Sequence, residues 1–100
     1  MAWRRIASTD DVQAGHGKEF NIDDKRIALF NQDGYYAMDG ICPHQDGSIA
    51  PGELDGDVVE CPLHAWHFNF KTGELQDYVK GVKLTTYKTK VENNEIYIDM

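Results

Sequence analysis

Two short segments of the sequence each carry one cysteine and one histidine, and they constrain the chain more than any other feature. The first is Cys42-Pro43-His44 and the second is Cys61-Pro62-Leu63-His64, with sixteen residues between His44 and Cys61. Two thiolates and two imidazoles suit zinc or iron–sulfur chemistry, because soft thiolates and imidazoles favour these metals over magnesium or calcium. We therefore expect the chain to fold so that both segments meet at one metal centre.

The spacing of these four residues helps to separate the two kinds of metal. Structural zinc sites usually take like ligands in pairs, as C-x2–4-C and H-x3–5-H, whereas each segment here mixes a cysteine with a histidine. Two mixed loops can place both sulfurs on one side and both imidazoles on the other, as a two-iron cluster with chemically different irons requires. A zinc knuckle and a pair of unliganded core cysteines remain as alternatives.

Length, cysteine count and charge set the broad class of the protein. A chain of 100 residues is long enough for one domain with a modest core, so we expect residues 1–100 to form a single domain. Its two cysteines are both assigned to metal, which leaves no disulfide and fits a reducing cytoplasm. The net charge of −7 argues against nucleic-acid binding, which needs clustered Lys and Arg. The same charge would assist docking to a basic patch on a partner protein.

No part of the sequence has the character of a membrane segment or an export signal. Arg4-Arg5 is followed by Ile6-Ala7-Ser8-Thr9-Asp10-Asp11, which contains no apolar run, so the arginine pair is not a signal. No segment approaches the eighteen apolar residues that a membrane span needs. A soluble, cytoplasmic protein is the expectation.

The pattern of apolar residues predicts short antiparallel strands. Residues 3–7 are expected to form an edge strand, residues 10–15 a loop, and His16 a solvated position in that loop. Apolar residues then alternate with polar ones up to Asp33-Gly34, a dipeptide typical of a hairpin turn. Asn93-Asn94 predicts a closing hairpin near the end of the chain. Short strands without a 3.6-residue period predict an all-β sandwich or incomplete barrel.

A further hairpin is expected between the two cysteine–histidine segments. Residues 52–60 turn at Asp55-Gly56, and this hairpin would bring Cys61 back beside Cys42. Residues 66–70 form the next strand and residues 71–73 the turn after it, so that residues 41–75, approximately, make a small metal-binding sheet with a loop at each ligand pair. Residues 84–91 then alternate as one more strand.

The spacing Cys42-x-His44 and Cys61-x-x-His64 resembles the signature of Rieske [2Fe-2S] proteins. The resemblance implies that Cys42 and Cys61 bind one iron of a [2Fe-2S] cluster and that His44 and His64 bind the other. It also implies an incomplete antiparallel β-barrel or sandwich with a small cluster-binding β-subdomain.

Within that family, the disulfide-free chain and its residues 52–64 resemble the Rieske-type ferredoxins of bacterial aromatic-ring-hydroxylating dioxygenase systems. This resemblance implies a one-electron carrier between a flavin-containing NAD(P)H ferredoxin reductase and a terminal oxygenase. With all four donors used as ligands, no coordination site stays open, so the domain is not expected to be an enzyme by itself. We also expect it to be a monomer.

The resemblance further implies a low reduction potential. High-potential Rieske proteins carry two additional cysteines at the positions of Gly47 and Leu63, and hydroxyl side chains at the positions of Trp66 and Phe68. Hydrogen bonds to cluster sulfur favour the reduced state, and these hydroxyl groups are missing here. The expected potential is about −150 mV, at the low end of the Rieske range.

Three positions near the ligands and two rival functions complete the predictions. Gln45 and Asp46 are candidates for a rim that faces a partner, and His67 is expected to be a surface residue rather than a ligand. Residues 42–47 also resemble the small Rieske-like subunit of assimilatory nitrite reductases. A rival of a different class is a zinc-stabilised interaction module, which would be colourless and free of acid-labile sulfide.

Overall fold

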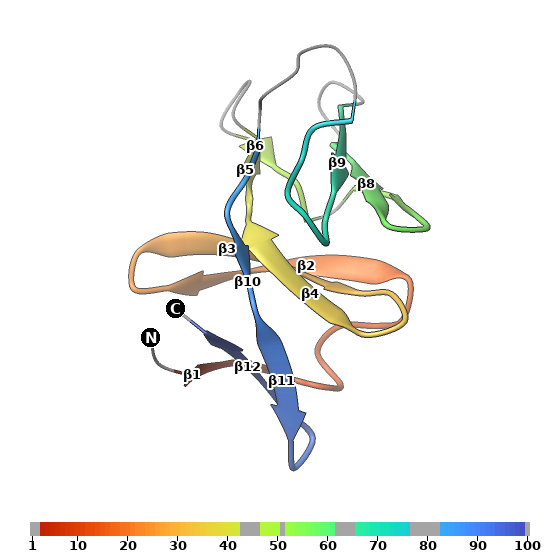
Figure 1. Cartoon of the computed structure of the whole chain (residues 1–100). Coiled ribbons are helices and arrows are strands. Elements are labelled where there is room, and N and C mark those ends of the chain that lie inside the picture. Colours follow the sequence, from red (N-terminus) through yellow and green to blue (C-terminus); the bar gives the residue numbers. More distant parts are fainter. Residues whose placement is uncertain (1–2, 43–46, 51, 62–65, 77–82, 100) are drawn as a thin grey trace.

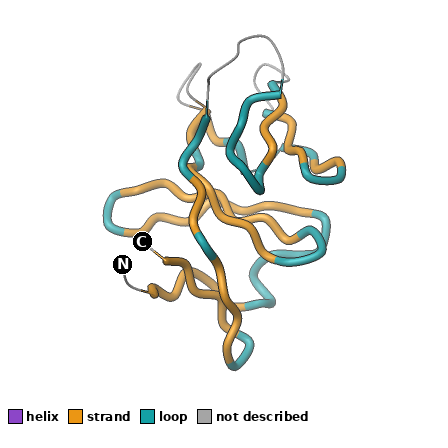
Figure 2. Tube along the Cα trace, viewed as in Figure 1, coloured by secondary structure: helices purple, strands orange, loops and turns teal. Residues whose placement is uncertain are grey.

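A computed structural model describes residues 3–42, 47–50, 52–61, 66–76 and 83–99 of the chain. Of Ile41, Cys42 and Gly47 it describes the backbone alone. The described residues form strands and connecting turns and contain no helix (Figure 2). The strands are β1 (Trp3–Ser8), β2 (His16–Ile22), β3 (Lys25–Asn31), β4 (Tyr35–Asp39), β5 (Ile41–Cys42), β6 (Gly47–Ser48), β7 (Leu54–Asp55), β8 (Val58–Glu60), β9 (His67–Asn69), β10 (Thr86–Tyr87), β11 (Thr89–Glu92) and β12 (Glu95–Asp99). The predicted all-β class is confirmed.

The strands form antiparallel sheets that are stacked along the molecule (Figure 1). The central sheet has the order β10-β4-β3-β2. On one side of it lies a three-stranded sheet of order β1-β12-β11, in which β1 is the predicted edge strand. On the other side lie two small sheets, β5-β6 and β7-β8-β9, which follow β4 in sequence and precede β10.

Tight turns with left-handed backbone conformation connect the hairpins. Asp33 and Gly34 turn β3 into β4 with φ of 54° and 132°, and Asn93 and Asn94 turn β11 into β12 with φ of 52° and 64°. The Asn93-Asn94 loop has two residues, and positive φ at both of them matches the right-handed twist of the strands. Asp33 and Gly34 are the last two residues of a three-residue loop, and Asp and Gly tolerate the positive φ that it requires. Both predicted hairpins are confirmed. Gly56, with φ of 60°, likewise turns β7 into β8.

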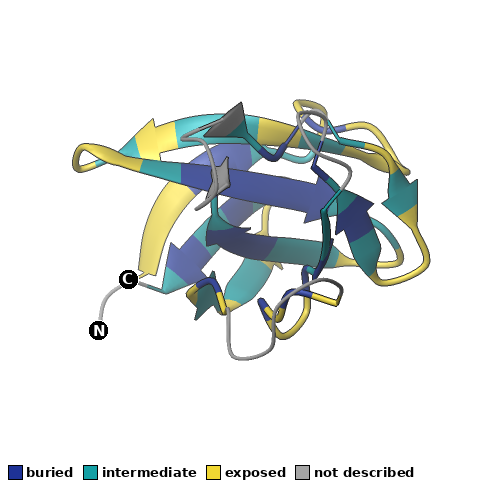
Figure 3. Ribbon diagram, turned by 90° about the horizontal axis from the view of Figure 1, so that it is seen from above, coloured by how far each residue is buried: buried dark blue, intermediate teal, exposed yellow. Residues whose placement is uncertain are grey.

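Strand β3 lies between two apolar clusters, and its side chains alternate between them. Ala28 and Phe30 belong to a cluster shared with the small sheets, whereas Ile27 and Leu29 belong to a cluster shared with β1 and β12. All four are completely buried, as expected for successive residues that point to opposite faces of a sheet covered on both sides. Figure 3 shows buried residues along the middle of the strands and exposed residues at the turns.

Two details of the fold differ from the prediction. His16 is exposed as expected, but it begins β2 and pairs with Asn31 instead of lying in a loop. The alternating segment 84–91 is not one strand in one sheet, because β10 pairs with β4 whereas β11 pairs with β12. The change of sheet occurs at Lys88, whose carbonyl oxygen accepts a hydrogen bond from the Asp99 N–H at 3.0 Å. An alternating pattern shows that both faces are used, but it does not show which neighbour each half of the strand will pair with.

Candidate metal centre

The first predicted ligand segment begins at the end of β5. Strands β5 and β6 pair through Ile41 with Ser48 and through Cys42 with Gly47. This pairing closes a loop of four residues, 43–46, with Cys42 at its base. His44, Gln45 and Asp46 lie outside the described residues, so the structure fixes where this loop starts and ends.

The second predicted ligand segment has the same plan. The backbone N–H of Cys61 donates a hydrogen bond to the carbonyl oxygen of Trp66 at 2.7 Å. This bond closes a loop of four residues, 62–65, with Cys61 at its base, and His64 lies outside the described residues. In each case, therefore, a cysteine is the residue just before the loop, and a predicted histidine ligand is one of the residues of the loop.

Direct backbone contacts join the segment that leaves the first loop to the segment that enters the second. The N–H of Glu60 donates to the carbonyl oxygen of Glu53 at 2.9 Å, and the N–H of Gly52 donates to Ile49 at 2.9 Å. A Cβ atom built on Gly52 would lie only 1.8 Å from the carbonyl oxygen of Glu60, the residue before Cys61. Only glycine permits such a close approach. The two loop bases are thus fixed at the same end of the molecule, as Figure 1 shows for β5, β6, β8 and β9.

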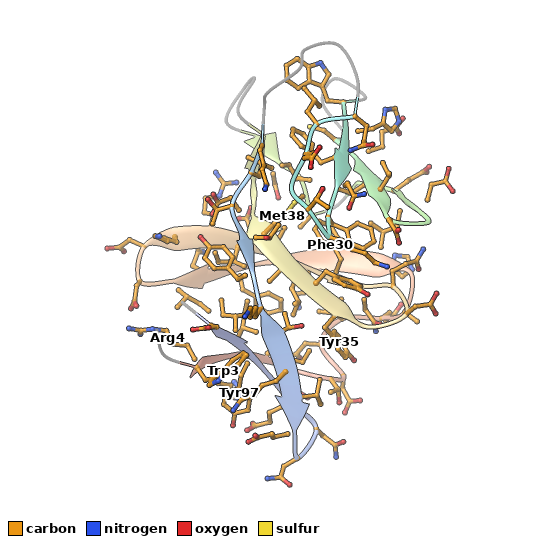
Figure 4. All side chains as sticks on the ribbon, viewed as in Figure 1. Trp3, Arg4, Phe30, Tyr35, Met38 and Tyr97 are labelled. Carbon is orange, nitrogen blue, oxygen red and sulfur yellow. The ribbon has the colours of Figure 1, made fainter. Side chains whose placement is uncertain are left out.

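Cys61 has the environment expected of a thiolate ligand on its protein side. Its side chain is completely buried and forms no disulfide, and it belongs to the same apolar cluster as Ile49, Val59 and Phe68. Phe30 and Met38 extend this cluster from the central sheet toward β8 and β9 (Figure 4). A sulfur donor between a closed loop and an apolar core fits a metal–sulfur site that is shielded from water on its inner side.

The predicted ligand set can be compared with the structure only in part. Within the described ranges no three His, Cys, Asp or Glu side chains gather in a way that could hold a metal ion. His44 and His64, two of the four predicted ligands, are outside those ranges, and so is the side chain of Cys42. The assignment of Cys42, His44, Cys61 and His64 therefore stays a prediction.

Strand β9 supports the predicted roles of the residues beside the second loop. Phe68 is completely buried and pairs with Val59, whereas the neighbouring His67 pairs with Glu60 on the opposite face of the sheet. The side chain of His67 is 40% exposed, and its Nε2 lies 3.4 Å from a carboxylate oxygen of Glu60. His67 is thus a surface residue, as predicted. Trp66 is partly buried against the same apolar cluster as Phe68.

The hairpin next to the second loop carries several carboxylates. Glu53, Asp55 and Asp57 are exposed, and Glu60 is partly exposed. Lys71 contacts Asp57 at 3.1 Å, and the hydrogen bond that it donates to this carboxylate raises the pKa of Lys71 above its ordinary value. Residues 53–60 contain four carboxylates and no Lys or Arg, so the hairpin keeps a net negative charge even though Lys71 pairs with Asp57.

Comparison with known protein families decides the identity of this centre. The model of the Rieske [2Fe-2S] domain matches residues 2–88 of the chain. The chain belongs to the Rieske [2Fe-2S] domain family. Its cofactor is accordingly a Rieske-type [2Fe-2S] cluster.

Several relatives of this Rieske domain are ferredoxins. The chain is 39% identical to the 3-phenylpropionate/cinnamic acid dioxygenase ferredoxin subunit of Shigella boydii serotype 4 (strain Sb227), over 96% of this chain and 93% of that protein. It is 33% identical to the biphenyl dioxygenase ferredoxin subunit of Pseudomonas sp. (strain KKS102), over 99% of this chain and 93% of that protein.

A solved structure gives the same relationship at the level of the fold. This structure is a complex of reduced oxygenase and oxidized ferredoxin in carbazole 1,9a-dioxygenase. The matching chain is 32% identical with a TM-score of 0.84, over 96% of this Rieske domain and 91% of the solved chain. Among the described residues, no helix is long and apolar enough to cross a membrane.

Proposed function

We propose that this Rieske domain is the ferredoxin of a multicomponent oxygenase system, in which it carries single electrons from a flavin-dependent NAD(P)H reductase to a terminal oxygenase. The observation that carries the proposal is the 39% identity to a dioxygenase ferredoxin subunit over almost the full length of both chains. The oxygenase–ferredoxin complex of carbazole 1,9a-dioxygenase, which contains a chain 32% identical to this one, supports an oxygenase as the electron acceptor.

We assign Cys42 and Cys61 to one iron of the cluster and His44 and His64 to the other. Replacing two thiolates by neutral imidazoles removes two negative charges, which raises the potential above that of an all-cysteine cluster. When bound, the cluster supplies a reversible one-electron couple.

The residues of the chain hold the ligands and exclude water. Val59 and Phe68 shield Cys61 from solvent on the core side. The hydrogen bond from Glu60 to Glu53 and the close contact at Gly52 keep the two loop bases together. A rigid, apolar support of this kind limits the rearrangement that accompanies a change in cluster charge.

The acidic hairpin β7–β8 is proposed to steer the encounter with both partners. Glu60 directly precedes Cys61 at the base of the second ligand loop, whereas Asp55 and Asp57 lie at the far turn of the hairpin. All of these carboxylates are part of the net charge of −7. Opposite charge on a partner accelerates association and disfavours wrong orientations, and this effect weakens as salt is raised. The reductase and the oxygenase should therefore present basic surfaces around their electron-exchange sites.

The remaining assignments follow from the same proposal. Residues 1–100 act as one domain, with residues 41–75 as its cluster-binding part. The domain has no catalytic activity of its own, because all four donors are used as ligands and none leaves an open coordination position. A monomer in the cytoplasm is proposed, where a reducing environment keeps the two cysteine ligands from forming a disulfide before the cluster is bound.

A small subunit of an assimilatory nitrite reductase is the second candidate. Solved structures named as nitrite reductase small subunits match this chain with a TM-score of 0.87, but they are only 23% and 21% identical. This likeness reflects the shared fold alone and does not favour that function over an oxygenase ferredoxin.

Cluster analysis and electron transfer between purified components test the proposal. The purified protein should contain two irons and two acid-labile sulfides per chain, as the [2Fe-2S] assignment requires, and should show the visible spectrum of a Rieske centre. A flavin reductase with NADH should reduce it, and a terminal oxygenase should reoxidise it. A colourless zinc protein would contradict the cofactor. Reoxidation by a sirohaem nitrite reductase, but not by any oxygenase, would contradict the proposed acceptor.

A further inference from the structure

A partly buried group of polar side chains lies beside the first ligand loop and plays no part in the function proposed above. The hydroxyl of Ser48 donates a hydrogen bond to Glu19 Oε1 at 2.9 Å. Arg26 donates to both oxygens of the same carboxylate, from Nε to Oε2 and from Nη2 to Oε1, each at 3.1 Å. The Glu19 and Arg26 side chains are only 24% and 35% exposed. These three residues join β2, β3 and β6 and are called the Glu19 network.

The Glu19 network attaches directly to the base of the first loop. Ser48 follows Gly47, the residue that pairs with Cys42, and Ser48 itself pairs with Ile41. When Ser48 binds Glu19, the strand that closes the loop is connected to the central sheet through a side chain. Each strand of the β5–β6 sheet contains only two residues, so this side-chain bond supplements a short backbone ladder.

Backbone hydrogen bonds support the same loop base from a second direction. The N–H of Ile49 donates to Gly40 at 3.0 Å, and the N–H of Gly40 donates to the carbonyl oxygen of Arg26 at 2.8 Å. Arg26 therefore supports the loop base twice, through its carbonyl oxygen and through its side chain on Glu19. A Cβ atom on residue 40 would lie 3.1 Å from the Ala28 nitrogen, so glycine at this position allows the loop base to lie close against β3.

The strength of the Glu19 network follows from its charge and its partial burial. A bidentate arginine–carboxylate pair is stronger than hydrogen bonds between neutral groups and fixes the orientation of the carboxylate. Glu19 is therefore held in place by Arg26 before it binds Ser48. Removing the Ser48 hydroxyl leaves that ion pair intact, so the loss should be felt mainly at the loop and not in β2 or β3.

We propose that Glu19 and Ser48 are positioning residues of the metal centre, which hold the base of the first loop so that its ligands meet those of the second loop. This inference rests on the proposed assignment of Cys42 and His44 as cluster ligands. Neither residue belongs to the cysteine–histidine motif. Glu19 also lies outside residues 41–75, the expected cluster-binding part of the chain.

The test compares variants of the network with a matched pair at the opposite side of the molecule. The variants are Ser48→Ala, Ser48→Thr and Glu19→Ala. The control is Glu95→Ala, because Glu95 also accepts a hydrogen bond from an arginine Nε, that of Arg5 at 2.7 Å, and one from a hydroxyl, that of Tyr97 at 3.4 Å. Glu95 lies in the β1-β12-β11 sheet, away from the small sheets. The measurements are the rate of iron release to a chelator, the EPR spectrum of the reduced protein, and the thermal unfolding midpoint.

The expected result separates a positioning role from general stabilisation. Ser48→Ala should release iron about fivefold faster than the natural protein, as expected for the loss of about 1 kcal/mol of loop stabilisation, and should alter the EPR line shape. Glu19→Ala should have at least the same two effects and should also lower the unfolding midpoint, because it leaves Arg26 without its carboxylate partner. Ser48→Thr, which keeps the hydroxyl, and Glu95→Ala should behave like the natural protein in both measurements.

Two results would overturn the inference. One is that Ser48→Ala and Glu19→Ala release iron no faster than Glu95→Ala. The other is that they unfold at lower temperature while the EPR spectrum stays unchanged, which would make the Glu19 network a general stabiliser. Absence of a [2Fe-2S] spectrum in the natural protein would instead contradict the proposed function and would be seen before any variant is compared.

Discussion

The contact between Gly52 and Glu60 allows a sharp test of how the two ligand loops are held together. A methyl group on residue 52 would place Cβ 1.8 Å from the Glu60 carbonyl oxygen, whereas real Cβ atoms essentially never come within 3.0 Å of such an atom. Gly52→Ala therefore requires a shift of at least about 1.2 Å between two backbone segments, the difference between these distances. The atom that Cβ would meet is a backbone oxygen and not the end of a flexible side chain. The two backbone segments, and with them the loop bases, must therefore move apart.

The energetic cost can be estimated from the contacts that this shift would break. Overpacking in a close-packed region costs about 1–3 kcal/mol, and the Glu60 to Glu53 hydrogen bond at 2.9 Å adds about 1 kcal/mol. A total of about 3 kcal/mol is a large part of the 5–15 kcal/mol that stabilises a typical domain. It should lower the thermal midpoint by roughly 12–24 °C in a chain of this size.

Gly56→Ala is the matched control, because it makes the same change in the same hairpin. Gly56 has φ of 60°, and a Cβ atom added to it would meet no other atom within 4 Å, so alanine there carries only the backbone penalty of about 1 kcal/mol. Circular dichroism melting and iron analysis measure both effects. The reasoning is refuted if Gly52→Ala melts within a few degrees of Gly56→Ala and keeps its full iron content.

Three further predictions concern the ligands, the potential and the pH dependence. Cys61→Ser should yield a folded protein that lacks most of its iron and its visible spectrum, and full retention of both would contradict the ligand assignment. Because Trp66 and Phe68 carry no hydroxyl, redox titration should give a midpoint of about −150 mV, and a value above roughly +100 mV would contradict this argument. Burial, and to a smaller extent the hydrogen bond to Asp39, raises the pKa of Tyr87 from 10.0 to about 12. The folded state therefore holds this proton more tightly than the unfolded state, so the resulting stability is complete below about pH 10 and is lost as pH rises toward 12. Tyrosinate absorbance should show this step in the natural protein and not in Tyr87→Phe, and an identical titration of the two would refute the assignment.

Local sequence signals predicted the hairpins well, because the turns depend on a few adjacent residues. Asp33-Gly34 and Asn93-Asn94 adopt the left-handed conformations that these residue types tolerate, and tertiary contacts are not needed to explain them. The base of each ligand loop could be located for a similar reason. A cysteine followed within a few residues by a histidine marks the loop even where the donor atoms themselves are not described.

Features that depend on distant residues could not be read from the sequence. The switch of residues 86–92 from one sheet to another depends on the pairing of β10 with β4, which lies far away in the chain. The Glu19 network was missed because Glu19 and Ser48 are 29 residues apart, and neither belongs to a recognisable motif. Glu19 lies in a segment where polar and apolar residues alternate, and this pattern predicts only an ordinary polar position on a strand.

The point where the small sheets leave and rejoin the central sheet suggests a use in protein engineering. The chain departs after β4 and returns at β10, and these strands are adjacent, with Met38 paired to Thr86 and the Asp39 N–H bound to Thr85 at 2.9 Å. An excursion whose two ends are neighbours can be exchanged as a cassette without re-routing the remaining strands. Grafting this cassette from homologues with other redox properties would yield chimeras that differ in driving force while the recipient framework stays the same.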